Sequence, residues 1–526
     1  MLQADEGSGF LRTSARVSIV TGVARVTGFA RYIVLGLAVG TTYLGNTYET
    51  ANWIPNIVFE LAAGGVLSAV FVPTFIQARE VGRERSIEIA SGLANTFLLL
   101  SVPVVVVGVF AAEPIMRIMT IAVEDPDIRA AQIETGTWFL YVFLPQVPLY
   151  VLAMVWTGIL HAHRRFLAPA AAPLFSSLVV ICAYLTFGAL GAGADLGAVT
   201  STQRYVLAGG TTAGVFVLAF SQLPSVLRTG MRWRPVLGWG DPAMRRALRA
   251  GLAGMAYFAI SEVGLIVTLL FANRVRGGVV AYRVAFAFFD LPRALIGIPV
   301  AAVLLPTLAE RFARNDHEGY ARYWSRGWRA AFLLGVPAAA GLVALGPELA
   351  NAVLSRAPSA ATPELVGATL RVLAFGVPAF VLVEPLIRSF FARHETRPPV
   401  AMNAVTVGVS TVIIVALTLA FSPTGARALE VIGLGLAAGH LLGASVGTTL
   451  LAARIERWKA GEDVRYAAVC VVRAAAMGAC VFGVVRWVDL GPEAAAVLGL
   501  VVGVSVYLLL TVPGGELRRT VRWVRR

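Results

Sequence analysis

Charged residues are scarce in this sequence. Asp, Glu, Lys and Arg make up 14% of its 526 residues, whereas an ordinary soluble domain carries about 25%. Lysine is nearly missing, because Lys459 is the only one and arginine supplies every other basic side chain. So few charges cannot cover a water-exposed surface, which excludes an ordinary soluble protein.

Cysteines and enzyme motifs are also rare or missing. The three cysteines, Cys182, Cys470 and Cys480, lie in apolar segments without CxxC or His–Cys spacing, so we expect neither disulfides nor a metal site. The sequence contains no phosphate-binding GxxxxGK loop, no nucleophile elbow and no HExxH. We therefore expect no enzyme and no cofactor. Coupling to Na+, to H+, to the membrane potential or to substrate supply stays open.

Long apolar runs are what the sequence does contain. Hydrophobic residues make up 57% of the chain, and the mean hydropathy is +0.75. A spanning helix takes about 20 apolar residues, and the runs are continuously apolar rather than alternating, which excludes a strand-built barrel. We predict an all-α polytopic membrane protein with about 14 transmembrane helices. The expected ranges are 17–39, 47–76, 88–111, 135–160, 168–190, 205–227, 250–272, 279–309, 330–354, 366–391, 399–421, 429–453, 466–487 and 494–512.

The net charge of +14 is distributed unevenly among the connections. Of the 44 Lys and Arg residues, 29 lie in the termini and the even-to-odd connections, 7 in the odd-to-even connections and 8 within the predicted spans. By the positive-inside rule, this places both termini in the cytoplasm. The basic excess thus indicates topology and attraction to anionic membrane lipids. A nucleic-acid partner is not needed to explain it.

Parts of the chain recur at nearly constant offset. Residues 69–75 (AVFVPTF) return as 302–308 (AVLLPTL), and a second set returns farther on, with Pro148, Ala162 and Pro169 echoed by Pro378, Ala392 and Pro399. Six helices separate the members of each pair, so the halves are expected to be parallel repeats. We predict two six-helix lobes, 1–230 and 231–456, followed by two extra helices and a basic tail at 457–526.

Several motifs together resemble a known transporter family. They are RVTGFARY at 25–32, PNIVFEL at 55–61, RRFLAPA at 164–170, LPRALIGIPVAAVLLPTL at 291–308 and FFARHETRPP at 390–399. In order and spacing, the chain is similar to the MurJ/MviN-type lipid II flippases of the multidrug/oligosaccharidyl-lipid/polysaccharide exporter superfamily.

The resemblance implies a function and a set of partners. Such a flippase moves lipid II, the undecaprenyl-pyrophosphate-linked peptidoglycan precursor, from the inner to the outer leaflet of the bacterial cytoplasmic membrane by alternating access, for cell-wall synthesis. Its partners would be this polyprenyl-linked glycan and membrane lipids, with cell-wall synthesis proteins left open. The resemblance also implies that the last two helices, roughly 466–512, flank a groove for the polyprenyl chain.

Other functions stay open beside this one. A flippase for another polyprenyl-linked oligosaccharide has the same chemical requirements. An ion-coupled multidrug antiporter of the same superfamily would be expected to have an acidic, apolar cavity. The arginines within the spans argue against this function. A non-transporting scaffold for cell-wall enzymes would leave the charges within the spans unexplained.

Candidate substrate-binding residues of the first half lie in the first two spans. Arg25 and Arg31 match the family's first-helix arginines, and a guanidinium binds phosphate oxygens bidentately without deprotonating. They lie about 120° apart on a straight helix, so we expect a bend at Gly28.

Asn56 and Glu60 are one turn apart in the second span, and Glu60 either pairs with one of these arginines or contacts the substrate or a proton. The chain departs from many family members in having Phe59 where they have arginine, and Asn46 where they have an acidic residue.

Candidates in the second half are Arg283, Asp290 and Arg293 in the eighth span. Arg283 and Asp290 are seven residues apart and share a face, whereas Asp290 and Arg293 form an i,i+3 pair. Well-studied relatives have a functional arginine at the position of Ala287 in this span. Arg283 lies one turn earlier on nearly the same face, so we expect it to substitute for that arginine. The alternative interpretation is that Asp290 and Arg293 neutralise each other.

Three further polar residues lie deep in the second half. Glu262, Glu384 and Asn403 carry oxygens suited to a hard cation or a titrating proton. Simple interhelical hydrogen bonds are the alternative.

The topology generates the first test. Cysteines introduced at Arg234 and Lys459 should be shielded from impermeant thiol reagents in intact cells, whereas cysteines at Thr42 or Asp195 should be labelled, because the charge distribution places the first pair in the cytoplasm. Labelling at Arg234 in sealed cells would contradict the fourteen-helix topology.

Overall fold

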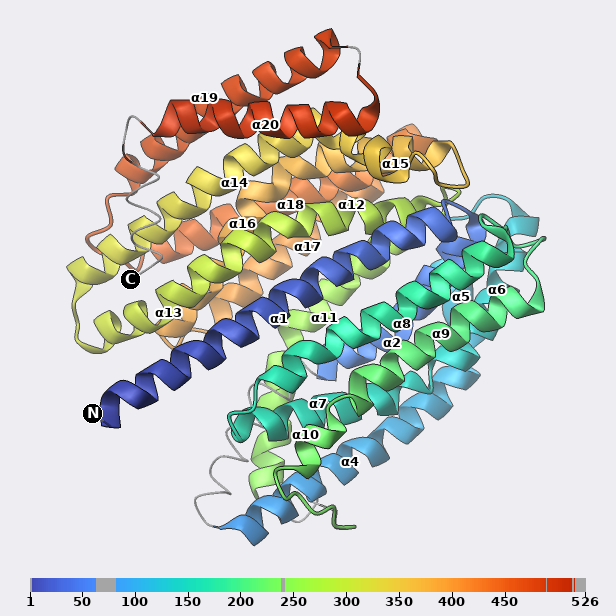
Figure 1. Ribbon diagram of the computed structural model, residues 1–526, viewed down its shortest axis with the longest axis horizontal. Coiled ribbons are helices and arrows are strands. Elements are labelled where there is room, and N and C mark those ends of the chain that lie inside the picture. The colour runs from blue at the N-terminus through green and yellow to red at the C-terminus, as the bar shows by residue number, and fades with distance from the viewer. Residues whose placement is uncertain (1, 63–81, 238–241, 489, 513–514, 516–526) are drawn as a thin grey trace. The chain divides into compact units, whose positions relative to one another are not determined.

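The computed structural model describes residues 2–62, 82–237, 242–488, 490–512 and 515 (Figure 1). Helices make up nearly all of this part of the chain, and no strand occurs in it. The all-α prediction is therefore confirmed. Residues 69–75, the first copy of the predicted repeat, lie outside the described residues, whereas 302–308 lie within a helix.

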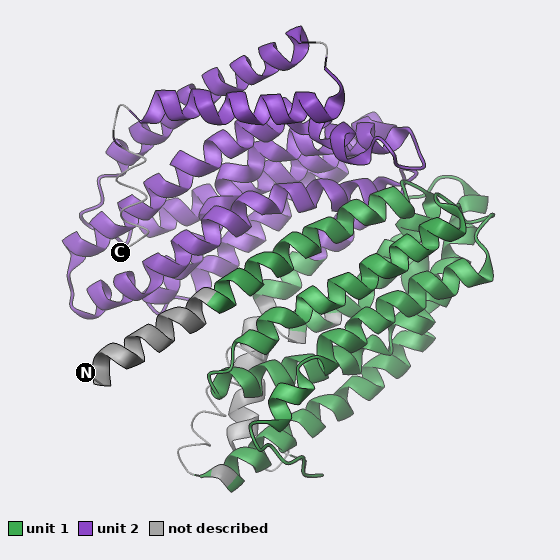
Figure 2. Cartoon of the chain, in the orientation of Figure 1, with its two compact units in different colours: residues 1–262 green, residues 263–526 purple. Residues whose placement is uncertain are grey.

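Contacts between residues group the chain into two units, Met1–Glu262 and Val263–Arg526 (Figure 2). The division falls within α11, which the sequence-based boundaries assign to the second lobe. The first unit contains α1 (Leu2–Ala38), α2 (Tyr43–Ala62), α4 (Arg83–Phe110), α5 (Ala112–Met119), α6 (Pro126–Phe143), α7 (Gln146–Ala162), α8 (Leu167–Gly191), α9 (Ser201–Phe220), α10 (Leu223–Leu227) and the first part of α11 (Pro242–Ala272).

The second unit is built from longer helices, two of them interrupted. It contains the end of α11, α12 (Gly278–Pro292), the π-helix η2 (Arg293–Gly297), α13 (Ile298–Ala313), α14 (His317–Leu354), α15 (Ala361–Leu373), the 3₁₀-helix η3 (Ala374–Gly376), α16 (Val377–Ala392), α17 (Arg397–Phe421), α18 (Gly425–Ala452), α19 (Ala460–Trp487) and α20 (Pro492–Thr511).

The predicted spans coincide with these helices. Eleven helical segments among the described residues are long and apolar enough to cross a membrane, and α6 with α7, bent by 40°, makes a twelfth. The two remaining predicted spans fall on α2 and α11, near which residues 63–81 and 238–241 are not described. The chain is thus a multi-pass membrane protein, and the count of about fourteen fits the helices observed.

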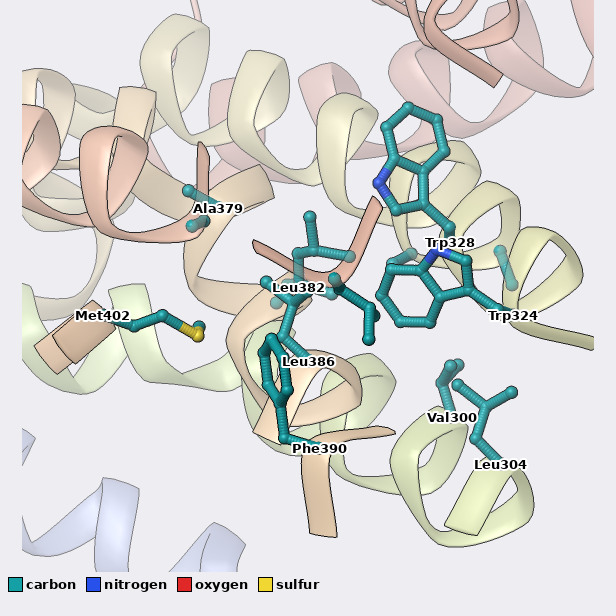
Figure 3. Packing of buried hydrophobic residues seen from close by; sticks show 14 of the residues in the cluster. Val300, Leu304, Trp324, Trp328, Ala379, Leu382, Leu386, Phe390 and Met402 are labelled. Carbon is teal, nitrogen blue, oxygen red and sulfur yellow. The ribbon is translucent and has the colours of Figure 1, made fainter. Parts of the chain in front are cut away.

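Side chains of α13, α14 and α16 form a large part of the buried core of the second unit, to which α12, α17, α18 and α19 also contribute (Figure 3). Trp324 and Trp328 of α14 pack with Leu304 of α13 and with Leu386 and Phe390 of α16, and all five are nearly inaccessible. A Cβ at Gly327 would approach Leu304 Cδ1 to 2.3 Å. The absence of a side chain at Gly327 therefore lets α13 lie close to α14.

A glycine stripe joins α17 to α18. Glycine occupies every fourth position of α18, at Gly435, Gly439, Gly443 and Gly447. A Cβ at Gly439 would lie 2.4 Å from the carbonyl oxygen of Thr406. Small residues at helical spacing allow close backbone approach, which is how membrane helices pack without a hydrophobic driving force between them.

The C-terminal helix pair is fixed to α14 by a buried carboxylate. Asp463 at the start of α19 is fully buried and accepts hydrogen bonds from Ser325 Oγ (2.7 Å) and Trp458 Nε1 (2.6 Å), with Arg329 as its ion-pair partner. From α20, the Tyr507 hydroxyl donates to the carbonyl oxygen of Leu333 at 2.6 Å. These bonds hold α19 and α20 against α14 within the second unit.

Asp195 caps α2 from the loop between α8 and α9. Its Oδ1 accepts from the backbone N–H groups of Tyr43 (3.0 Å) and Leu44 (3.3 Å), and Gly193 N–H donates to the Ala38 carbonyl at 3.2 Å. The first N–H groups of a helix have no intrahelical partner, and a carboxylate there also meets the positive end of the helix dipole. The loop thereby holds the turn between α1 and α2.

Burial changes the choice of labelling sites for the topology test. Thr42 is 1% exposed, so a cysteine there would be a poor probe. Asp195 is partly buried and engaged as a cap, whereas Ala198 in the same loop is exposed. A cysteine at Ala198 is therefore the better probe of this side.

The cap predicts a local effect on stability. Asp195→Ala should lower the free energy of unfolding by about 1–2 kcal/mol, because two N–H groups lose their acceptor. Asp195→Asn keeps an acceptor and should recover most of that loss. Thermal unfolding of the purified protein measures both variants, and an Ala variant as stable as the wild type would show that the cap contributes nothing.

Candidate functional site

Three helices of the first unit bring polar side chains together around Tyr150. The Tyr150 hydroxyl on α7 donates to Asn56 Oδ1 on α2 at 3.0 Å, and its ring stacks on Phe59 with centroids 4.7 Å apart. Asn56 Nδ2 in turn donates to the Asn52 carbonyl at 2.8 Å. Both functional ends of the Asn56 amide are thus engaged by the protein itself.

Arg31 of α1 belongs to the same cluster. Its guanidinium donates to the Tyr32 hydroxyl at 3.1 Å and lies over the Tyr32 ring, 5.0 Å from the centroid. Arg31 and Glu60 both interact electrostatically with Tyr150. The structure therefore brings together Arg31, Asn56 and Glu60, which the sequence singled out separately. Arg31 makes no ion pair with any described residue, and neither does Glu60.

Arg25 lies apart from this cluster. It is exposed, whereas Arg31 is half-buried. Helix α1 runs without interruption through Gly28, and a Cβ there would meet no described atom within 4 Å. The bend expected at Gly28 stays a prediction, and no close contact with a described residue requires glycine at this position.

Sequence reasoning missed Glu49. This residue is 3% exposed and interacts electrostatically with Arg31. On α2, Glu49, Trp53, Asn56 and Glu60 follow i, i+4, i+7 and i+11 spacing, which places them on one face. That spacing was the signal available in the sequence.

A chain of hydroxyl groups adjoins this polar face. Tyr184 Oη lies 3.0 Å from Tyr48 Oη, which lies 2.6 Å from Thr211 Oγ1, and Thr211 donates to the Leu207 carbonyl at 2.7 Å. Because the Thr211 proton is used, Tyr48 donates to Thr211 and Tyr184 donates to Tyr48. The chain joins α2, α8 and α9 at full burial.

Glu262 also faces α2. It is 8% exposed and accepts a hydrogen bond from Trp53 Nε1 at 3.2 Å. The sequence grouped it with Glu384 and Asn403 as a cation or proton site. In the structure, Glu262 and Glu384 have separate partners in separate units, while Asn403 is half-buried on α17. The described residues contain no cluster of three or more His, Cys, Asp or Glu that could hold a metal ion.

The second unit holds an ionic triad. Arg293 Nε lies 2.7 Å from Asp290 Oδ1 and Arg293 Nη1 lies 2.9 Å from Glu384 Oε1, while the guanidinium stacks over Phe380 at 5.0 Å. Arg293 is therefore neutralised by Asp290, as the alternative interpretation of this pair predicted. It is also bound by Glu384, 91 residues away, so the triad has a net charge of −1.

A π-helix places Arg293 at this position. The segment η2 begins at Arg293 directly after Pro292. A Cβ at Gly297 would lie 2.7 Å from the Val381 carbonyl, so glycine allows η2 to lie close to α16, which carries Glu384. Single-turn π segments within helices are frequent at functional sites. Arg283, ten residues earlier, is half-buried on α12, and its substitution for the family arginine stays a prediction.

An apolar groove of about 810 Å³ opens in the second unit. Its walls are mostly small and apolar side chains of α14 and α19, and single residues of α15, η3, α16 and α18 complete them. Phe332 and Val471 line one end, and Glu348 and Arg486 line the other.

Comparisons with known proteins agree with this architecture. The family model described as lipid II flippase MurJ matches residues 36–501. A probable lipid II flippase MurJ of Rhizobium meliloti is 29% identical over 500 residues, which cover 92% of this chain and 88% of that protein. The lipid II flippase MurJ of Burkholderia cenocepacia is 24% identical over 396 residues, covering 74% of each chain.

Solved structures show the same fold. A lipid II flippase MurJ in an inward closed conformation superposes with a TM-score of 0.77 at 16% identity, covering 95% of this chain and 98% of that one. An inward-facing multidrug transporter of the MATE family reaches a TM-score of 0.65 at 16% identity, covering 83% of this chain and 94% of its own. Because the family model extends over most of the sequence, the chain belongs to the MurJ family of lipid II flippases.

Proposed function

We propose that this protein moves lipid II from the inner to the outer leaflet of a bacterial cytoplasmic membrane by alternating access, with both termini in the cytoplasm. The observation that carries the proposal is Arg31, a half-buried cation within an apolar span. It donates to a tyrosine hydroxyl and forms no ion pair with a described residue, although the buried Glu49 interacts with it electrostatically. Charges at such positions are costly and mark functional sites. The proposed partners are this lipid-linked glycan and the surrounding lipids.

The surroundings of Arg31 suit a pyrophosphate. A pyrophosphate needs cationic donors to leave water, and the arginine fork binds two of its oxygens at once. Tyr32 and Tyr150 supply hydroxyl groups close to the guanidinium, and Asn56 supplies an amide. The proposed reaction is transport, so no bond of the substrate is broken.

The driving force is proposed to be an ion gradient or the membrane potential. Glu49 and Glu262 are buried carboxylates: Glu49 interacts electrostatically with Arg31, and Glu262 accepts a hydrogen bond from Trp53 of α2. A group of this kind changes its charge when it takes up a proton or a cation. These two residues are thus the first positions at which coupling should be examined.

The substrate test concerns Arg31. Arg31→Ala should abolish complementation of a flippase-depleted strain at normal membrane abundance, and Arg31→Lys should restore only part of it, because the charge remains without the bidentate geometry. One charged hydrogen-bonded contact contributes about 1.5–3 kcal/mol, so substrate binding should weaken about 10- to 150-fold.

A matched control is available on the same helix. Arg16 is exposed on α1, and Arg16→Ala should complement fully. A normally abundant, fully active Arg31→Ala protein would contradict the assignment of the headgroup to this cluster.

The groove along α19 is proposed to hold the polyprenyl tail. Photo-crosslinkers at Ala475 and Ala479, which line the groove, should capture a polyprenyl probe more efficiently than crosslinkers at Val107 of α4 or Phe216 of α9, which are exposed on the first unit. Ala475→Phe should lower both crosslinking from Ala479 and transport, because the ring fills the groove. Equal yields at all four positions would reject this role of the groove.

A further inference from the structure

The groove of the second unit has one charged end. Arg371 lies in the last turn of α15 and Arg486 in the last turn of α19, and both line the groove. Both side chains are exposed, and neither forms an ion pair with a described residue. The guanidinium of Arg486 lies over the Phe482 ring, 4.8 Å from its centroid. Two arginines without carboxylate partners thus border one apolar cavity.

Glu348 adds an acceptor to the same end. Its Oε2 is buried and has no hydrogen-bond partner among the described residues, although Glu348 lines the groove. A buried oxygen that lacks a donor is unfavourable. An isoprenoid chain cannot supply that donor, whereas a sugar hydroxyl next to a phosphate can.

The groove runs along α14 from Phe332 to Glu348, and its charged end is the one at Glu348. Leu333 packs with Cys470, and Leu345 packs with Val481, so α14 and α19 run side by side in the same direction. Phe332 to Glu348 on α14 spans about 24 Å at 1.5 Å per residue. An extended lipid chain along this wall would therefore place its headgroup at Arg371 and Arg486.

We infer that Arg371 and Arg486 form a second phosphate site, which binds the pyrophosphate of a polyprenyl-linked glycan whose tail occupies the groove. Under the predicted topology, α19 begins at the cytoplasmic side, so this site lies toward the outer leaflet and binds the lipid after it has crossed. The inference rests on the proposed function. It adds a site for the translocated headgroup, formed by other residues than Arg31.

Binding to the purified full-length protein in nanodiscs tests the site. The probes are undecaprenyl diphosphate, which carries the anionic head, and undecaprenol, which does not. The double variant Arg371→Gln, Arg486→Gln should bind undecaprenyl diphosphate about tenfold more weakly or worse, since two charged contacts are lost. Its affinity for undecaprenol should be unchanged. Arg427→Gln, an exposed arginine that does not line the groove, should bind both probes as the wild type does.

Glu348 is tested with lipid II itself. Glu348→Leu should lower the affinity for lipid II relative to that for undecaprenyl diphosphate, because only the glycan offers hydroxyl donors, whereas loss of the negative charge favours both diphosphate heads alike. An unchanged ratio of the two affinities would overturn the contact with the glycan.

Three results would overturn the phosphate site. The first is equal affinity of the wild type for the two probes, and the second is an unchanged affinity of the double variant for undecaprenyl diphosphate. The third is displacement of undecaprenyl diphosphate by an equal concentration of dioleoylphosphatidylglycerol, which would indicate a general phospholipid site. The assay measures binding in a variant set that leaves Arg31 intact. A failure here is therefore distinguishable from a failure of the proposed transport, which is measured by complementation with Arg31 variants.

Discussion

An ionised side chain inside an apolar span must have a partner, because hydrocarbon offers none. Much of this structure follows from that constraint. Asp463 is fully buried because Arg329, Ser325 and Trp458 surround it, and its bonds fix the C-terminal helix pair. Arg293 is tolerated within the second unit because Asp290 and Glu384 enclose it. The polar contacts that satisfy charges are thus also the contacts that position helices.

Close packing between helices is the second physical requirement of this fold. Between apolar helices in lipid, association depends on contact distance rather than on burial from water. Glycines bring α18 to α17, and Gly297 brings η2 to α16, where Glu384 can reach Arg293. Small residues of α14 and α19 have the opposite effect at the groove. There they leave open space, and the groove lies along them.

Features determined by local spacing could be predicted from the sequence. Apolar runs predicted where the spanning helices lie, although α1 and α14 begin at Leu2 and His317, well before the predicted 17 and 330. The i,i+3 spacing identified the pair of Asp290 and Arg293. Partners distant along the chain could not be predicted, since they depend on how helices pack. Trp53 and Glu262 are 209 residues apart, and Asp195 caps a helix about 150 residues earlier. Glu49 was missed although its spacing with Asn56 and Glu60 could be read from the sequence, because its burial and its interaction with Arg31 are visible only in the structure.

The arginines of the spans differ in what an anion would have to displace. At Arg293, a phosphate would compete with two carboxylates already at hydrogen-bond distance and would be repelled by their charge. At Arg31, the direct partners are a neutral hydroxyl and an aromatic face, so an anion adds a charge-assisted contact without breaking an ion pair. Arg371 and Arg486 have no carboxylate to give up among the described residues. We therefore expect anions to bind those arginines that lack a carboxylate partner. Residue type alone does not show this difference, which is why the sequence made Arg293 a candidate beside Arg31.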